Sequence, residues 1–286
     1  MRWVEDIARG EWLCALLDTR WQDMHAVVPH GYEAYTRIFH PVPRDRPRDT
    51  GTWHAYGLID TPELESESVR WAVVAEAFGQ TMHPLAQYHR LLGRARVHHV
   101  EAIDAAGWRY AEPEEGCLEI PLLAQLARHL VQHTATPESG IAAVWEGWGG
   151  LTGGVGYAVA SIGPLGRDGL ISPAPSSAQL PVEAVNGPRL RLPDRDYFLF
   201  EVGIGQFTDA AWASSAPWVS ASDRPQSPSV LWPDDHAWVL VTEIDYDSTV
   251  VAGPRELIDR IVGDLELEAL EIPEGADLSW RGDRIN

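Results

Sequence analysis

The sequence contains no lysine, and all 22 of its Lys or Arg positions are arginine. A lysine ammonium forms the Schiff base with carbonyl cofactors and contacts the phosphates in a Walker-type loop. The absence of lysine therefore excludes enzymes that depend on pyridoxal phosphate and P-loop nucleotide-binding proteins. A codon bias toward G and C, which replaces lysine by arginine, is a sufficient cause.

The chain also has few cysteines and no long apolar run. Cys14 and Cys117 are far apart and belong to no CxxC pair, which excludes a zinc knuckle or a disulfide framework and favours a reducing compartment. Glu5 and Asp6 lie where a signal peptide needs apolar residues. Eight glycines interrupt the longest charge-free stretch, 147–166. We therefore expect a cytoplasmic protein without a membrane span.

Acidic residues outnumber basic ones by 42 to 22, and the formal net charge is -20. A field of this sign repels nucleic-acid phosphates and anionic membrane surfaces. The charge thus argues against nucleic-acid and membrane binding, and it favours association with a basic protein partner.

The length of 286 residues and the apolar fraction of 45% fit one compact domain with a substantial core. Apolar spacing of three and four residues predicts that 1–135 is mainly helical. The predicted helices are 30–40, 69–78, 83–92 and 121–133, and a proline-rich loop follows the first of them at 41–49.

After residue 136 the apolar residues recur at about every second position, which predicts that 136–286 is mainly strands. The predicted strands lie in 141–147, 189–193, 196–202, 236–245 and 267–273, and a last short helix is expected at 254–262. A segment rich in Gly, Pro and Ala at about 147–188 reads as an insertion. Helices followed by strands predict an α+β fold with one antiparallel sheet.

Three carboxylates alternate at the end of the longest predicted strand, at Glu243, Asp245 and Asp247. Strand alternation would place all three on one face. Carboxylates this close repel one another unless a cation, an arginine or water relieves the repulsion, and Mg²⁺ and Ca²⁺ select such oxygen clusters. The pattern predicts either a metal or acid/base site, or the solvent face of a strand leaving the core.

His129 and His133 are four residues apart on the predicted helix 121–133, so both rings can reach one ligand from the same face. The pattern lacks the glutamate of the zinc motif HExxH. Two interpretations remain open here, namely a metal site or imidazoles that complement the helix end.

Tryptophan is abundant, with 13 residues. Its large apolar body and single donor make it frequent at interfaces. Trp145, Trp148 and Trp232 are the candidates for partner binding, and the alternative is that these side chains fill the core.

Several phrases together resemble a family of uncharacterised proteins common in high-GC actinobacteria, among them VPHGYEAYTRIFHP, LPDRDYFLF and SPSVLWPDDHAWVLVTEIDYDST. The similarity covers most of the chain except about 151–187, and it implies no activity. VPHGYEAYTRIF is also more distantly similar to the LPxxYxxF phrase of the SUKH superfamily, with Val28 where leucine is usual. That resemblance implies an immunity-type protein that binds a toxin.

Our preferred hypothesis is a protein that acts by binding a basic protein partner, such as a toxin nuclease or a regulatory protein, without a cofactor. The alternative is a metal-dependent enzyme, such as a hydrolase, in which Glu243, Asp245 and Asp247 hold a divalent metal or act as acid and base, with His129 and His133 nearby. A structural domain without a ligand is the third hypothesis.

Overall fold

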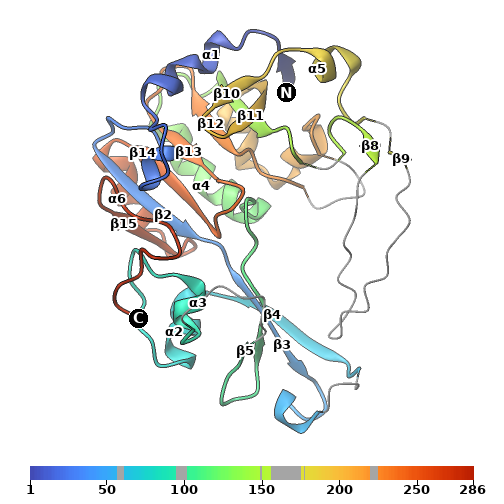
Figure 1. The fold of residues 1–286 in the computed structure, drawn as a ribbon, viewed down its shortest axis with the longest axis vertical. Coiled ribbons are helices and arrows are strands. Elements are labelled where there is room, and N and C mark those ends of the chain that lie inside the picture. The colour runs from blue at the N-terminus through green and yellow to red at the C-terminus, as the bar shows by residue number, and fades with distance from the viewer. Residues whose placement is uncertain (57–60, 95–101, 149, 156–174, 177, 220–224) are drawn as a thin grey trace.

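The computed structural model describes residues 1–56, 61–94, 102–148, 150–155, 175–176, 178–219 and 225–286. Within these ranges a large antiparallel sheet of nine strands forms the upper part of the molecule (Figure 1). In order across the sheet its strands are β1 (Arg2–Val4), β11 (Arg195–Val202), β7 (Gly140–Trp145), β12 (Val230–Pro233), β13 (Val239–Val241), β14 (Ser248–Gly253), β2 (Ala34–Phe39) and β15 (Ala269–Ile272), with β10 (Leu190–Leu192) also paired to β11.

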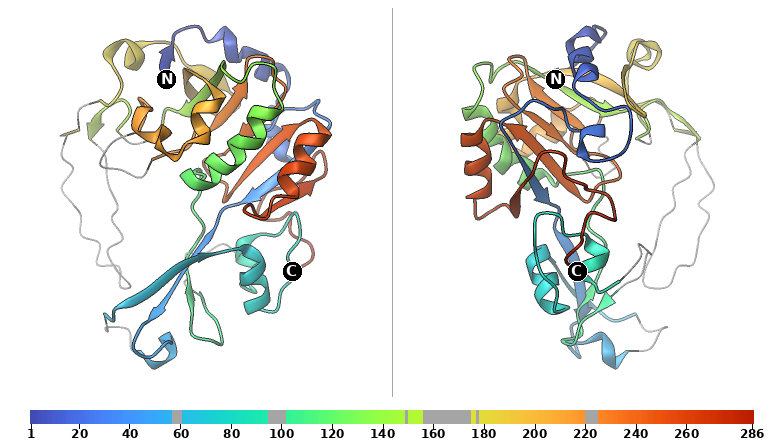
Figure 2. Two further views of the ribbon diagram at one scale, coloured as in Figure 1. Left: turned by 180° about the vertical axis from the view of Figure 1, so that it is seen from behind. Right: turned by 60° about the vertical axis from the view of Figure 1, so that its left-hand side comes forward.

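Both faces of this sheet are covered. Helices α4 (Ile120–Gln132) and α6 (Arg255–Val262) lie side by side over one face (Figure 2), together with the 3-10 turns η4 (Ile204–Thr208) and η5 (Ala210–Ser215). The other face packs against an N-terminal segment that contains α1 (Ala8–Glu11), η1 (Trp12–Ala15) and η2 (Met24–Ala26), and against residues 276–278. Alternate residues of each strand enter the two cores, so its central strands are apolar on both sides.

A second antiparallel sheet forms the lower part, in the order β4 (Leu64–Val69), β3 (Val42–Pro47), β6 (Arg109–Tyr110), β5 (Ala102–Ile103). The chain passes from β2 directly into β3 through His40 and Pro41, so one extended stretch belongs to both sheets (Figure 1). A separate apolar cluster around Trp71 joins this sheet to α2 (Trp71–Ala77) and α3 (Tyr88–Leu91). The remaining elements are η3 (Trp53–Ala55), α5 (Val182–Asn186) and the pair β8 (Gly154–Val155) and β9 (Pro175–Ser176).

The expected α+β class and the antiparallel pairing are confirmed, but the expectation that residues 1–135 are mainly helical is wrong. The predicted helix 30–40 is strand β2, because Tyr35 packs in one core of the large sheet and Phe39 in the cluster of the second sheet. Their spacing matches a helix only because the strand runs from one core to the next. The predicted loop 41–49 contains β3, which pairs with β4 through Arg44–Glu67 and Arg46–Glu65 ion pairs that apolar periodicity does not detect.

Three predicted helices do occur, at α2, α4 and α6. The predicted helix 83–92 is limited to α3. Of the predicted insertion 147–188, residues 149, 156–174 and 177 lie outside the described residues, and the rest contains β8, β9 and α5. None of the helices in the described ranges has the length and apolar character needed to cross a membrane.

The C-terminal residues are tied to the segment before α3 by Asp283, which is almost fully buried. Its carboxylate accepts hydrogen bonds from the backbone N–H groups of Gln87, Ile285 and Asn286 and pairs with the ring of His83. Burial alone would raise the pKa of Asp283, but the bonds from Asn286, Ile285 and Gln87 hold it at about 2.

We therefore expect Asp283→Asn to lower the free energy of unfolding by about 1–2 kcal/mol near neutral pH. The depressed pKa means that the contribution is complete above about pH 4 and is lost as the pH falls toward 2. Urea unfolding of both proteins at neutral pH and at about pH 2.5 measures this difference. A difference that persists unchanged in acid would show that the carboxylate charge is not its source.

Candidate functional site

The three alternating carboxylates lie in a loop and not on a strand. Strand β13 ends at Val241 and β14 begins at Ser248. Between them the Tyr246 N–H donates to the Glu243 carbonyl, which closes a turn and ends the ladder. The expectation that Glu243, Asp245 and Asp247 share one strand face is therefore wrong, because the turn points them to different surroundings.

Each carboxylate of this loop meets an arginine. Nη2 of Arg195 lies 2.6 Å from Oδ2 of Asp245 and 3.3 Å from Oε1 of Glu243. Burial raises the pKa of Glu243, whereas Arg195 opposes the shift. Asp247 receives a hydrogen bond of 3.1 Å from Nη2 of Arg37. Arginines thus relieve the mutual repulsion that the spacing predicts.

Arg37 comes from β2 and is buried, with 1% of its surface exposed. Its other donors bind Oγ of Ser248 at 2.8 Å and the carbonyl oxygens of Ala86 and Pro84 at 2.7 and 3.4 Å. Its guanidinium also lies over the rings of Phe39 and Trp71. The donors of Arg37 are therefore bound within the protein, and they join β2 to β14 and to the segment before α3.

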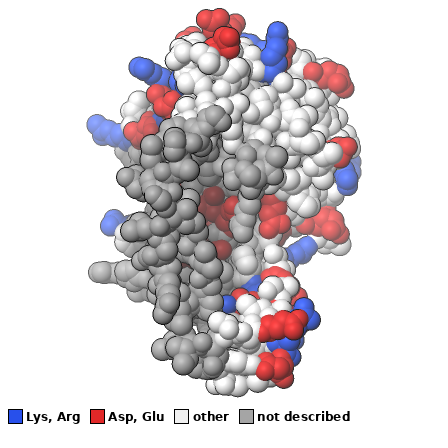
Figure 3. Space-filling model, turned by 90° about the vertical axis from the view of Figure 1, so that its right-hand side faces the viewer, with Lys and Arg blue, Asp and Glu red and all other residues white. Residues whose placement is uncertain are grey.

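Next to Arg37 is a hollow of about 310 Å³, which we call the acidic pocket. It lies between the β13–β14 loop, α3, the segment 112–115 and the residues 278–280. Its lining residues are Arg37, Gln87, Tyr88, His89, Glu112, Pro113, Glu115, Asp245, Tyr246, Asp247, Ser248, Leu278, Ser279 and Trp280. Figure 3 shows acidic side chains gathered where the upper and lower parts of the molecule meet.

A glycine allows the segment 112–115 to approach the loop. Gly116 has a φ of +69° and donates its N–H to the Tyr246 carbonyl at 2.9 Å. A Cβ at this position would come within 2.7 Å of the Ile244 Cα. The close backbone approach therefore depends on the missing side chain, and it brings Glu112 and Glu115 to the wall of the pocket.

Two further lining residues differ in exposure. His89 is 8% exposed, and its Nε2 is buried with no hydrogen-bond partner among the described residues. Burial, reinforced by Arg90, lowers the pKa of His89, so the ring is neutral near pH 7.

Trp280 is 47% exposed at the rim, and Arg281 covers one of its faces with the guanidinium 4.6 Å from the ring centroid. Another exposed indole, Trp21, packs edge-on against Tyr246.

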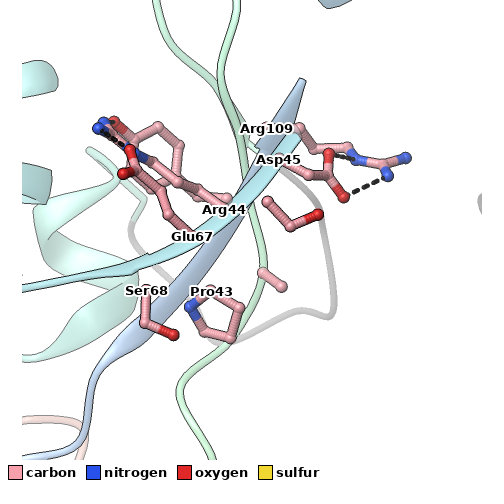
Figure 4. A pocket seen from close by; sticks show the side chains of 9 residues that line it. Pro43, Arg44, Asp45, Glu67, Ser68 and Arg109 are labelled. Carbon is pink, nitrogen blue, oxygen red and sulfur yellow. Dashed lines mark hydrogen bonds and ion pairs between the residues drawn. The ribbon is translucent and has the colours of Figure 1, made fainter. Parts of the chain in front are cut away.

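A second hollow, of about 330 Å³, lies on the lower sheet (Figure 4). Its charged residues are paired with one another, because Arg44 binds Glu67 and Arg109 binds Asp45 in the arrangement that Figure 4 draws. These ion pairs hold the strands β3, β4 and β6 together. We therefore assign this hollow a structural role.

The two histidines of α4 lie over the face of the large sheet opposite to Tyr246. His129 Nε2 is 2.6 Å from Oδ2 of Asp264, and His133 Nδ1 donates to the His129 carbonyl at the helix end. The structure therefore does not bring these rings to the carboxylate loop. Their metal-binding role stays a prediction, and the second ring has the helix-end geometry of the alternative interpretation.

Another acid and histidine cluster consists of His25, His30 and Glu274, whose ligand atoms lie within 4.8 Å of one another. The two imidazoles are stacked with centroids 3.6 Å apart, so their in-plane lone pairs do not converge on one point. In addition, Nε2 of His25 accepts the Gly275 N–H, and its Nδ1 donates to the Val28 carbonyl. The cluster fastens the N-terminal segment to the C-terminal one and does not fit a metal.

The three predicted partner-binding tryptophans occupy different environments. Trp145 and Trp148 are half-buried and pack edge to face with centroids 5.8 Å apart. Trp232 is completely buried in the core and does not reach a surface. Sequence reasoning missed Arg37, His89 and Trp280, although the single arginine in the apolar strand AYTRIF was a usable signal for the first.

Comparisons with family models, with curated proteins and with solved structures find no match to this chain. The two family resemblances of the sequence therefore stay predictions.

Proposed function

We propose that the protein acts by binding a basic protein partner through the acidic pocket. The observation that supports this most strongly is the pocket lining, which contains four carboxylates and one guanidinium. The guanidinium of Arg37 is buried and donates its hydrogen bonds to groups of the protein itself, so it does not recruit an anion.

The rim adds apolar surface suited to a protein partner. Trp280 and Trp21 are 47% and 45% exposed, and Tyr246 lies in the loop between the pocket and Trp21. Exposed indoles next to carboxylates are typical of sites that bind cationic and amphipathic side chains. The net charge of -20 would steer such a partner toward the protein at low ionic strength.

The same geometry weakens the alternative of a metal-dependent enzyme. A divalent cation needs several carboxylate oxygens that converge on one point. Glu243 and Asp245 point to Arg195, whereas Asp247 points to Arg37. The binding function is therefore the one that the arrangement supports best.

A fluorescent octa-arginine peptide tests the proposal by anisotropy. We expect Asp245→Asn combined with Glu115→Gln to weaken binding about tenfold, because each lost rim charge costs up to about 1 kcal/mol. Arg281→Gln should strengthen binding, since it removes a competing cation from Trp280. Raising the salt concentration should reduce the difference between the proteins.

The matched control is Glu256→Gln combined with Asp259→Asn. Both side chains are exposed on α6, over the opposite face of the large sheet from Tyr246, and the change in net charge is the same. If the two double variants weaken peptide binding equally, attraction is a property of the whole charged surface and the proposal is wrong.

A further inference from the structure

We infer that the acidic pocket receives one arginine side chain of the partner and recognises its guanidinium group. This inference rests on the proposed function and assigns the chemical group that the site takes. Its volume of about 310 Å³ is at the lower end of the range of small-ligand pockets, which suits one long side chain better than a bulky cofactor.

The pocket offers hydrogen-bond acceptors at different positions. Oδ1 of Asp247 accepts a hydrogen bond from Arg37, and 22% of the Asp247 side chain is exposed to the pocket and to solvent. The Asp245 side chain is 67% exposed at the rim, where one oxygen binds Arg195. A planar group with five donors can bind several acceptors at once, which an ammonium on a flexible stem does less well.

The buried ring of His89 supports the inference independently of the acidic residues. A buried nitrogen without a partner is costly, and a bound donor removes that cost. With its proton on Nδ1, the neutral ring accepts one N–H of the guanidinium at Nε2 once the groups that cover this buried nitrogen move aside. Because burial keeps His89 neutral near pH 7, it adds no charge that would repel the cation.

Aromatic rings complete the surroundings of a guanidinium. Tyr88, Tyr246 and Trp280 line the pocket, and flat cations stack on such rings. The neighbouring structure already uses this contact, since the guanidinium of Arg37 lies 4.6 Å from the Phe39 ring centroid. Stacking favours arginine over lysine at this site.

The test compares three blocked amino acids, Nα-acetylated amides of arginine, citrulline and lysine, by calorimetry and amide chemical shifts. Citrulline has nearly the shape of arginine without its charge. We expect the arginine compound to bind with a Kd on the order of 1 mM and at least about tenfold more tightly than the other two. Equal binding of citrulline or of lysine would overturn the assignment of a guanidinium.

Two variants locate the bound group. His89→Phe keeps a ring but removes the acceptor, and should weaken arginine binding at least fivefold, whereas His54→Phe, at an exposed histidine of the lower part, should leave it unchanged. Asp245→Asn, at the exposed rim, gives the same answer without altering a buried residue. Unchanged affinity in both pocket variants would overturn the inference.

The octa-arginine experiment separates the two proposals. If the peptide depends on the pocket charges but blocked arginine and citrulline bind alike, the guanidinium inference fails and the proposed function remains. If peptide binding does not depend on the pocket, both fail.

Discussion

Replacement of Arg37 by leucine is expected to lower the free energy of unfolding by about 3–5 kcal/mol, as for other buried charges that lose their partner. The substitution removes the cation that pairs with the Asp247 carboxylate. Burial raises the pKa of Asp247 even when Arg37 is present, so the carboxylate without its partner is costly. It also removes the donors to Ser248 and Ala86, which join strand β14 to the segment before α3 beside the pocket. Urea unfolding measures the loss.

The double variant Arg37→Leu, Asp247→Asn serves as the control. Removing both charges should recover a substantial part of the loss, because no unpaired charge then remains buried. A loss of less than about 1 kcal/mol for the single variant would show that Arg37 is not an important buried link between the large sheet and the segment before α3.

Acidification is expected to cost about 3 kcal/mol of stability between pH 6.5 and 4 through His40 alone. This residue lies between β2 and β3, is 1% exposed, and has its ring between the Glu114 carbonyl and Oγ1 of Thr249. Burial lowers its pKa to about 4, so the folded protein resists the proton that the unfolded chain takes up near 6.5. The contribution is complete above pH 6.5 and is lost as the pH falls toward 4.

The comparison with His40→Gln isolates this effect from other titrating groups. Stability of the variant should fall less over the same interval, whereas His54→Gln, at an exposed histidine, should behave like the natural sequence. Parallel stability curves for the natural protein and His40→Gln would contradict the neutral, buried state of His40.

The elements that the sequence predicts well are those whose signal is local. Helix α4 has an apolar stripe that begins after a proline at its first turn, and α6 begins directly after its N-cap Pro254 and is followed by Gly263. Five strands of the large sheet, β7, β10, β11, β13 and β15, were predicted because their apolar runs stand out between Gly and Pro residues, whereas β1, β2, β12 and β14 were not. These features need no knowledge of distant contacts.

The strands of the N-terminal half could not be predicted in this way. The character of β2 depends on its pairing with β14 and β15, which lie more than 200 residues away. The arginines of β3 are paired only when β4 places Glu65 and Glu67 opposite them. Tertiary pairing therefore decides these segments, and local periodicity misleads.

The candidate site was predicted in part. Spacing drew attention to Glu243, Asp245 and Asp247 and to the need for a counter-charge, but not to the arginines at positions 37 and 195 that provide it. The pocket combines residues from α3, the 112–115 segment and the C-terminal segment. No sequence pattern connects these parts, because only the junction of the two sheets brings them together.

The most direct test of the central claim is to map where the octa-arginine peptide binds, by following the amide chemical shifts of the isotopically labelled protein during a titration at low ionic strength. If the peptide occupies the acidic pocket, the first and largest changes occur at residues 243–248, at 87–89 and at 278–281. Changes concentrated on the exposed acidic face of α6, or spread evenly over the acidic surface, would contradict it.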